Sequence, residues 1–372
     1  MNEHSRPGLG LFELLGRHWQ RPAGITTVRF SPDLSAVAFA ASDGSIALAP
    51  IAEAEPPENR IRISSDLGQM RILPRSKPPA PLSSVGARSG SPAPLVAHVA
   101  ASFLVGTDRG EVIRLSGQGE LGDILFTAHG AVTALDHWST LAGLTVASDR
   151  RHLYVARGRE AVAQIRFEEE DPISAIAISP DARRIAALFG RGLAVWTLEG
   201  ASLSLRVTAL PAAPISLCWN EGGSHVACGL ATGGFSLVGA ARGSTHTVMN
   251  FPAPVRSLSW SRPASALIAS GAYRIAAWLL QDGMAGEAIS AGRPGLVSVD
   301  TVAAHPRREL VAAGYADGRI VVAQLRASDE LVVRVDGPSV TALVWSDDGR
   351  HLAIGDSEGG ASIVTFPPQI FK

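Results

Sequence analysis

The sequence repeats a short pattern of strands at a spacing of about 40 residues, and this spacing limits the fold more than any other feature. The clearest copy covers residues 338–366, where three short apolar runs are separated by polar turns at 346–349 and 356–360. Small turn residues between runs of alternating side chains are typical of β-hairpins. The first strand of the copy recurs at residues 25–30, 95–99, 132–136, 173–178, 215–219, 255–260, 299–304 and 340–345.

This repeat predicts an all-β chain of four-stranded units arranged in a ring, because only such units recur at this period with short strands and tight turns. We expect eight units, with seven as the alternative, in a single domain over residues 23–372. The last unit supplies only three strands. We therefore expect the N-terminal segment, residues 1–22, to pair with the C-terminal segment and complete it; for residues 11–19 a short helix is the alternative. Such pairing closes the ring and leaves no open sheet edge.

Several units also carry remnants of a known repeat. Trp196 and Trp278 end third strands, and His129-Gly130 precedes a first strand. An aspartate stands in four of the hairpins, at Asp43, Asp108, Asp149 and Asp317. These units resemble WD repeats in a degenerate form, since neither tryptophan is followed by aspartate. The resemblance implies a WD40-like β-propeller of about eight four-stranded blades.

The composition excludes several classes of protein. Hydrophobic residues make up 46% of the chain and charged residues 18%, which allows a large core, and the net charge of −1 argues against general nucleic-acid binding. The Arg- and Ala-rich composition, with lysine only at Lys77 and Lys372, is bacterial-like. The sequence shows no secretory signal and no apolar run of membrane-spanning length, so we expect a cytoplasmic protein that does not bind membranes.

Two further features concern local structure. Cys218 and Cys228 are too few for a disulfide framework or a cysteine-built metal site; we expect buried reduced thiols, with a disulfide as the alternative. Residues 74–94 are rich in proline, serine and glycine, which predicts a flexible surface insertion, with a proline-rich docking peptide as the alternative.

No motif in the chain indicates catalysis or a cofactor. The G-x-G-x-x-G match at residues 117–122 joins two predicted strands and lacks the following helix of a nucleotide site, so we interpret it as a β-turn. None of the ten histidines has metal-ligand spacing, and we expect His129 to stabilise its own loop. Asp136 and Asp300 lie on inner strands, where a channel metal would make the chain a propeller-type enzyme such as a lactonase-like hydrolase.

The most suggestive side chains are arginines in the hairpins between second and third strands, which share one face of a propeller. Guanidinium groups round one rim suit the capture of carboxylate or phosphate. A solvated rim is the alternative, and the acidic residues 168–171 would partly neutralise it. We expect a non-enzymatic platform for a protein partner of acidic or phosphate-bearing character, either as a monomer or as a structural subunit of a larger complex. The six candidate residues are Arg109, Arg150, Arg151, Arg191, Arg274 and Arg319.

Overall fold

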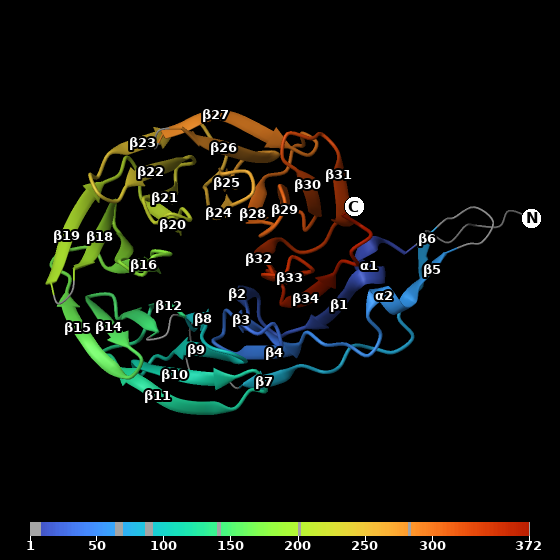
Figure 1. Cartoon of the computed structure of the whole chain (residues 1–372), viewed down its shortest axis with the longest axis horizontal. Coiled ribbons are helices and arrows are strands. Elements are labelled where there is room, and N and C mark those ends of the chain that lie inside the picture. Colours follow the sequence, from blue (N-terminus) through green and yellow to red (C-terminus); the bar gives the residue numbers. More distant parts are fainter. Residues whose placement is uncertain are drawn as a thin grey trace, which may run out of the picture.

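The computed structural model describes residues 9–63, 70–85, 92–139, 143–199, 202–281 and 284–371. It contains eight four-stranded antiparallel sheets arranged in a ring, with each sheet running outward from the axis (Figure 1). The structure thus confirms the all-β propeller and the count of eight blades.

Each blade is a meander whose first strand lies nearest the axis. From the axis outward, the strands of blades 1 to 4 are β2 (Ile25–Phe30), β3 (Ala36–Ala41), β4 (Ile46–Pro50) and β7 (Ser83–Val85); β8 (Leu95–Ala97), β9 (Ser102–Gly106), β10 (Glu111–Ser116) and β11 (Leu121–Thr127); β12 (Ala134–Trp138), β13 (Leu144–Ser148), β14 (His152–Arg157) and β15 (Glu160–Arg166); β16 (Ile173–Ile178), β17 (Arg184–Phe189), β18 (Gly192–Glu199) and β19 (Ser202–Ala209). Those of blades 5 to 8 are β20 (Pro214–Trp219), β21 (His225–Leu230), β22 (Phe235–Gly239) and β23 (Thr245–Val248); β24 (Leu258–Ser261), β25 (Ala266–Ala269), β26 (Ile275–Gln281) and β27 (Met284–Ala291); β28 (Val299–Ala304), β29 (Leu310–Tyr315), β30 (Ile320–Gln324) and β31 (Glu330–Arg334); β32 (Val340–Trp345), β33 (His351–Asp356), β34 (Gly360–Thr365) and β1 (Gly16–Gln20).

Blade 8 is completed by the N-terminal strand. β1 pairs antiparallel with β34, from Gly16 opposite Val364 to Gln20 opposite Gly360. The helix α1 (Leu11–Leu15) precedes it, so the helix and the strand that were alternatives for this segment are both present, one after the other. Leu15 is fully buried in the core between blades 7 and 8. Residues 1–8 lie outside the described residues.

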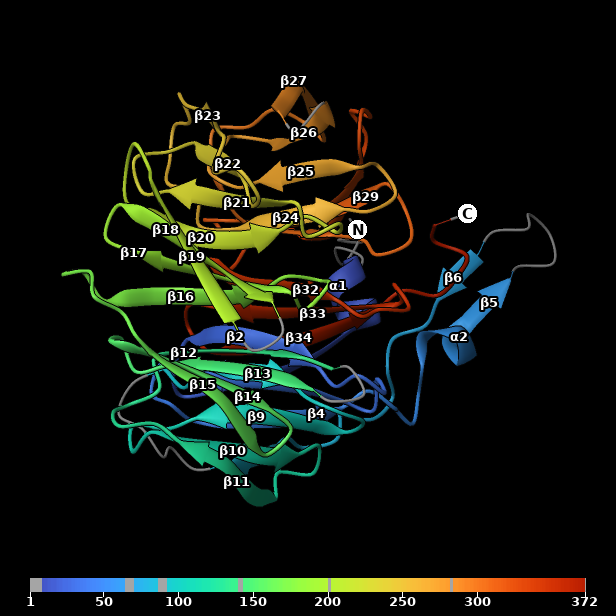
Figure 2. The same ribbon diagram turned by 60° about the vertical axis from the view of Figure 1, so that its left-hand side comes forward.

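The segment predicted as a flexible insertion is partly a blade strand. Ser83–Val85 forms β7, which pairs with β4 and is the outer strand of blade 1. These three residues contain no proline, so their backbone N–H groups remain available for the ladder. The extra structure lies earlier in the chain: α2 (Pro57–Arg60) and the hairpin of β5 (Ile61–Ile63) and β6 (Met70–Ile72) project from the edge of the ring (Figures 1 and 2). Residues 86–91 of the predicted insertion lie outside the described residues.

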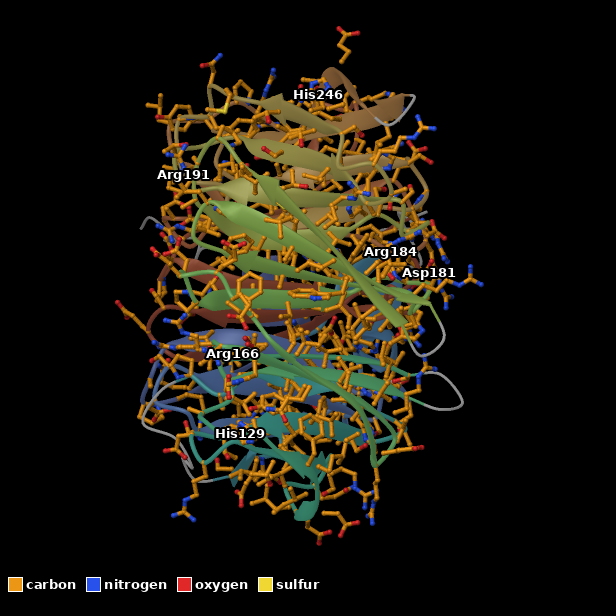
Figure 3. All side chains as sticks on the ribbon, turned by 90° about the vertical axis from the view of Figure 1, so that its left-hand side faces the viewer. His129, Arg166, Asp181, Arg184, Arg191 and His246 are labelled. Atoms are coloured by element: carbon orange, nitrogen blue, oxygen red, sulfur yellow. The ribbon has the colours of Figure 1, made fainter. Side chains whose placement is uncertain are left out.

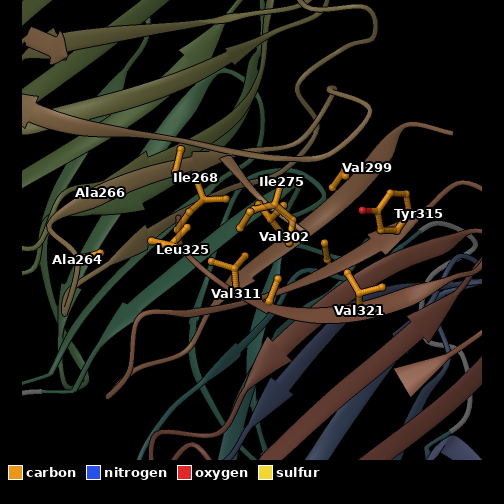
Figure 4. Close-up of a cluster of buried hydrophobic side chains, with 14 residues drawn as sticks. Ala264, Ala266, Ile268, Ile275, Val299, Val302, Val311, Tyr315, Val321 and Leu325 are labelled. Atoms are coloured by element: carbon orange, nitrogen blue, oxygen red, sulfur yellow. The ribbon is translucent and has the colours of Figure 1, made fainter. Parts of the chain in front are cut away.

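The core lies between neighbouring blades and is built largely from second and third strands. Every residue of β3, β13 and β33 is buried, because these strands are covered on both faces by adjacent blades. Between blades 6 and 7, Ile268 and Ile275 pack against Val302 and Val311 (Figure 4). Dispersion and burial over eight such interfaces stabilise the ring.

Hydrogen bonds from side chains to backbone also join the inner strands of adjacent blades. Ser257 Oγ accepts a bond of 3.1 Å from Val302 N, and Ser259 Oγ accepts one of 3.0 Å from Ala304 N. Such bonds connect strands that share no ladder, so they fix the position of one blade against the next.

Candidate interaction face

The six predicted arginines lie on one face of the ring, which we call the linker face. It carries the turns between second and third strands and the linkers that lead from each blade to the next. The turns between first and second strands lie on the opposite face. Figure 3 views the ring from its side and shows Arg191 on one face and the pair Asp181 and Arg184 on the opposite face. The shared face follows from strand alternation, as the sequence predicted, but the side chains differ in what they contact.

Arg319 is an internal tie rather than a rim cation. Its guanidinium lies 4.1 Å from the centroid of the buried Tyr315 ring, and Nη1 lies 3.4 Å from Oε1 of Glu330. The Glu330 side chain is only 4% exposed. An arginine held by a ring and a buried carboxylate is satisfied within the protein.

Arg151 and Arg191 also make contacts within the face. Arg151 Nη1 donates to Glu169 O at 3.2 Å, and Arg191 Nη2 donates to Pro211 O. Each of these bonds fastens a turn to the neighbouring linker. The acidic segment that contains Glu169 is therefore held beside the arginines, and its Glu168 carboxylate lies 3.6 Å from Arg166 Nε.

The side chains of Arg109, Arg150 and Arg274 are exposed and make no hydrogen bond or ion pair within the described part of the chain. They belong to blades 2, 3 and 6. The structure thus places all six arginines on one face, where three make no bond within the described part of the chain, Arg151 and Arg191 are exposed but each donate to a linker carbonyl, and Arg319 is held internally.

The linker face also carries exposed apolar side chains that the sequence analysis missed. Leu296 is 94% exposed, Val335 is 70% exposed and Tyr273 is 47% exposed. Leu296 lies in the linker from blade 6 to blade 7, and Val335 lies in the next linker. The sequence signal that could have identified Leu296 is a leucine in a short linker that also contains glycine and proline. Such a linker needs no large apolar side chain for its own packing.

Backbone hydrogen bonds hold Leu296 outward. Gly295 N donates to Tyr273 O at 3.1 Å, and Val299 N donates to Ala272 O at 2.9 Å. At the start of the linker, Arg293 N donates to Glu330 Oε2 at 3.0 Å. The linker is thus fixed on both sides of its tip. We call Tyr273, Arg274, Arg293, Leu296 and Val335 the Leu296 patch.

Asp136 is one of the two residues considered as ligands of a channel metal. Its carboxylate accepts hydrogen bonds at the junction between blades 3 and 4. Its Oδ2 accepts a bond of 2.7 Å from Ile178 N, and Oδ1 accepts one of 2.9 Å from His137 N. Burial raises the pKa of this carboxyl, and the two backbone donors together with the Arg29 guanidinium act in the opposite direction. The carboxylate is occupied by these donors.

Asp300 has similar partners. Ser298 Oγ donates to its Oδ1 at 3.1 Å and Ser339 Oγ donates to its Oδ2 at 3.2 Å. Within the described ranges, the protein has no cluster of three or more histidine, cysteine, aspartate or glutamate side chains arranged to hold a metal ion.

His129 belongs to a network that fastens its linker to the turn of blade 3. Its backbone N–H donates to Tyr154 Oη at 2.9 Å, and that hydroxyl donates to Asp149 Oδ2 at 2.7 Å. The His129 ring packs edge-on against His152, with 5.5 Å between the ring centroids, and its Nδ1 lies 3.3 Å from Gln164 Nε2. The predicted stabilising role is thus filled by the backbone N–H as well as by the ring.

The remaining sequence candidates have structural roles. Residues 117–120 join β10 to β11 as a turn, with Gly119 at a φ of +95° that favours glycine, and Leu121 and Gly122 begin β11. Both cysteines are unpaired thiols. Burial raises the pKa of Cys218 to about 12 and raises that of Cys228 as well, so neither is a reactive thiolate at neutral pH.

The ring can be compared with known proteins. No family model matches the sequence. The C-terminal WD40 domain of Sif2 superposes with a TM-score of 0.63 at 13% identity, covering 94% of this chain and 99% of that domain. The chain has the β-propeller fold of WD40 domains. A second solved structure, that of U3-55K, superposes on this WD40-type propeller with a TM-score of 0.54 at 18% identity, covering 95% and 98% of the two chains.

One sequence relative was also found. COMPASS component SWD3 of Saccharomyces cerevisiae is 29% identical over 125 residues, which are 33% of this WD40-type propeller and 40% of SWD3. The match therefore spans less than half of either protein. In the described part of the propeller, neither helix is long and apolar enough to cross a membrane.

Proposed function

We propose that this WD40-type propeller is a non-enzymatic platform that binds a partner protein on its linker face. The observation that carries the proposal is the 94% exposure of Leu296 on a linker whose backbone is fixed by hydrogen bonds. Tyrosine and arginine are enriched in protein-binding hot spots, and the exposed leucine beside them offers apolar surface that a partner can bury.

The comparison with SWD3 supports the same proposal at a coarser level, since that relative is named as a component of a complex. The two acids that the enzyme alternative would need, Asp136 and Asp300, accept hydrogen bonds that join blades. This use of both carboxylates favours the platform over a propeller-type hydrolase. The partner that fits the patch has an apolar anchor for Leu296 and Tyr273 and a carboxylate or phosphate for Arg274 and Arg293.

The proposal is tested by affinity purification from the native cell with the wild-type chain and two variants. Leu296→Asp places a charge on the patch, and Val99→Asp makes the same change at a 45% exposed valine on the opposite face. Burying a leucine side chain contributes about 1.5–3 kcal/mol, so we expect Leu296→Asp to weaken recovery of the partner about 10-fold or more.

The Val99→Asp chain should recover the same partner as the wild-type chain. Equal recovery by all three chains would show that the linker face at Leu296 is not the binding surface. Turnover of a metabolite by the purified wild-type chain would contradict the non-enzymatic assignment.

A further inference from the structure

A cavity opens on the opposite face of the ring, at the junction of blades 5 and 6. Its volume is about 470 Å³, and it lies between the turn that follows β20 and the turn that follows β24. Trp260 and Leu280 supply its apolar wall, while the Trp219 ring packs away from the cavity into the core between blades 4 and 5. A cavity of this size is within the range of roughly 300–1,000 Å³ in which small molecules bind.

The corresponding junction between blades 4 and 5 is closed by a side chain. Arg184, the first residue of β17, reaches across and donates from Nη1 to Gly223 O at 3.0 Å. His225 has the equivalent position at the start of β21. Its Nδ1 instead lies 2.9 Å from Ser224 Oγ of its own turn, so it does not reach blade 6.

The junction between blades 7 and 8 is closed in a different way. His305 is only 3% exposed, and its Nε2 lies 3.1 Å from Gly349 O of the next blade. Arg307 Nε donates to Asp347 O at 3.2 Å across the same junction. At the junction of blades 5 and 6, the residue equivalent to Arg184 is His225, and its ring does not fill the space between the two blades. The cavity is therefore open.

The tryptophans show the same difference. Trp219 Nε1 donates to Ala177 O of the preceding blade at 3.0 Å, and Trp345 Nε1 donates to Ala303 O at 3.2 Å. Trp260 stands at the same place on its inner strand, but its Nε1 is buried with no acceptor among the described residues. A buried donor without a partner costs free energy of folding. The bond from the indole to the preceding blade, which Trp219 and Trp345 both make, is therefore missing at the junction that carries the cavity.

The charges around the cavity cancel. Glu221 and Arg262 form an ion pair across its mouth and satisfy each other. The partial burial of His225 lowers the pKa of its ring, so this side chain is uncharged at neutral pH. A charged ligand would have to break the ion pair, whereas an uncharged ring can stack on the Trp260 indole and use a polar group of the turns such as the Ser265 hydroxyl.

We propose that this cavity binds an uncharged, planar heteroaromatic molecule against Trp260 and Leu280. The site is distinct from the Leu296 patch, which lies on the other face of the ring. The propeller would then have a small-molecule site and a protein-binding face on opposite sides of one rigid body.

The test uses the full chain and isothermal titration with indole and adenosine as uncharged probes and with benzoate and benzamidine as charged ones. The blocking variant is Gly222→Trp. Gly222 lines the cavity, and a Cβ added there meets no atom within 4 Å, so a large side chain can fill the space without distorting the backbone. The matched control is Asp347→Trp, which adds the same ring to an exposed position on the equivalent turn of blade 8.

We expect at least one uncharged probe to bind the wild-type chain and the Asp347→Trp chain with equal affinity, at a dissociation constant of about 1 mM or below, and to bind Gly222→Trp at least 10-fold more weakly. Both charged probes should bind the wild-type chain at least 10-fold more weakly than the uncharged one. The proposal is overturned if no uncharged probe binds, if a charged probe binds best, or if Gly222→Trp binds as well as the wild-type chain. Equal melting temperatures of the three chains verify that the variants are folded.

Discussion

Arg17 of the closing strand and Glu53 of blade 1 form a buried ion pair. Nε and Oε2 are 3.8 Å apart, and the two side chains are 2% and 7% exposed. Arg17 also donates to Pro50 O at 2.7 Å and to Ile51 O at 2.9 Å, while Arg75 holds the same carboxylate from the segment before β7. The strand that completes blade 8 is thereby fastened to blade 1 and to the base of the projecting hairpin.

We predict that Arg17→Met lowers the free energy of unfolding by about 2 kcal/mol or more, chiefly because it leaves the Pro50 and Ile51 carbonyls without donors. Arg75 still pairs with Glu53 in this variant, so the carboxylate is not left without a cation. Urea unfolding measures the loss. Arg159→Met is the control, because Arg159 pairs with Asp123 at a site where both side chains are more than half exposed, and such pairs contribute about 0–1 kcal/mol. A loss no larger than that of the control would mean that the closure does not depend on Arg17.

The second prediction concerns α1, the helix that precedes the closing strand β1. Leu15 is fully buried between blades 7 and 8, so Leu15→Ala should cost about 2–5 kcal/mol through lost burial and the cavity that remains. Leu9→Ala changes a 55% exposed leucine in the same segment and should leave the unfolding free energy within about 0.5 kcal/mol of wild type. Similar values for the two variants would show that α1 does not contribute to closure.

Arg319→Ala should destabilise the fold rather than weaken partner binding. It removes the guanidinium from the Tyr315 ring and leaves the buried Glu330 carboxylate without its ion-pair partner, for a loss of about 2 kcal/mol or more. Thermal unfolding measures the effect. Arg109→Ala, at an exposed arginine of the same kind of turn, should keep the wild-type melting temperature, and an equal drop in both variants would contradict the assignment of Arg319 as an internal tie.

The salt dependence of partner binding should depend on arginines of the Leu296 patch. We expect the double variant of Arg274→Ala and Arg293→Ala to bind more weakly at low salt and to lose most of the decrease in affinity that added salt causes for the wild-type chain, because exposed charges are screened within about 10 Å at 0.1 M salt. The control is the double variant of Arg109→Ala and Arg150→Ala. If this control flattens the salt dependence instead, the binding surface lies over blades 2 and 3.

Stability should fall as the pH is lowered from about 6.5 toward 4. Burial lowers the pKa of His137 and of His351 from 6.5 to about 4, so both rings are uncharged in the folded chain at pH values where the unfolded chain binds protons. Their contribution is fully present above pH 6.5 and is lost as the pH falls through this window. Urea unfolding at pH 7.5, 6 and 5 measures the decrease.

We expect His137→Gln to reduce this pH dependence. A folded chain that became more stable between pH 7.5 and 5 would contradict the direction of both pKa shifts.

The blade count and the shared face of the arginines could be predicted from the sequence because both depend on local signals. Turn residues such as those at 346–349 mark where the strands end. Because successive strands run in opposite directions, the order of the strands then fixes which turns share a face. The short β7 could not be predicted, since its three residues are surrounded by prolines and receive their partner, β4, from more than 30 residues earlier in the chain.

The state of each candidate side chain depended on contacts that are distant in sequence. Whether Arg319 is free or tied is decided by Glu330, and whether the junction at Trp260 is closed is decided by where the His225 ring turns. Periodicity carries no information on such pairs, because it describes the backbone of one blade and not the side chains of the next. The exposure of Leu296 is of the same kind, since the backbone bond between Gly295 and Tyr273 joins the linker to the hairpin between β25 and β26, more than 20 residues earlier in the chain.

The pairing of β1 with β34 has a consequence for how the protein is made. His18 and Ser362, whose side chains are 2.9 Å apart across this pair, are separated by 344 positions along the chain. At a synthesis rate of about 5–20 residues per second, β1 leaves the ribosome roughly 20–70 s before its partner strand exists. Throughout that interval the growing chain carries an unpaired strand at its beginning and an open edge at its end, and the ring becomes a single cooperative unit only when the last strand is released.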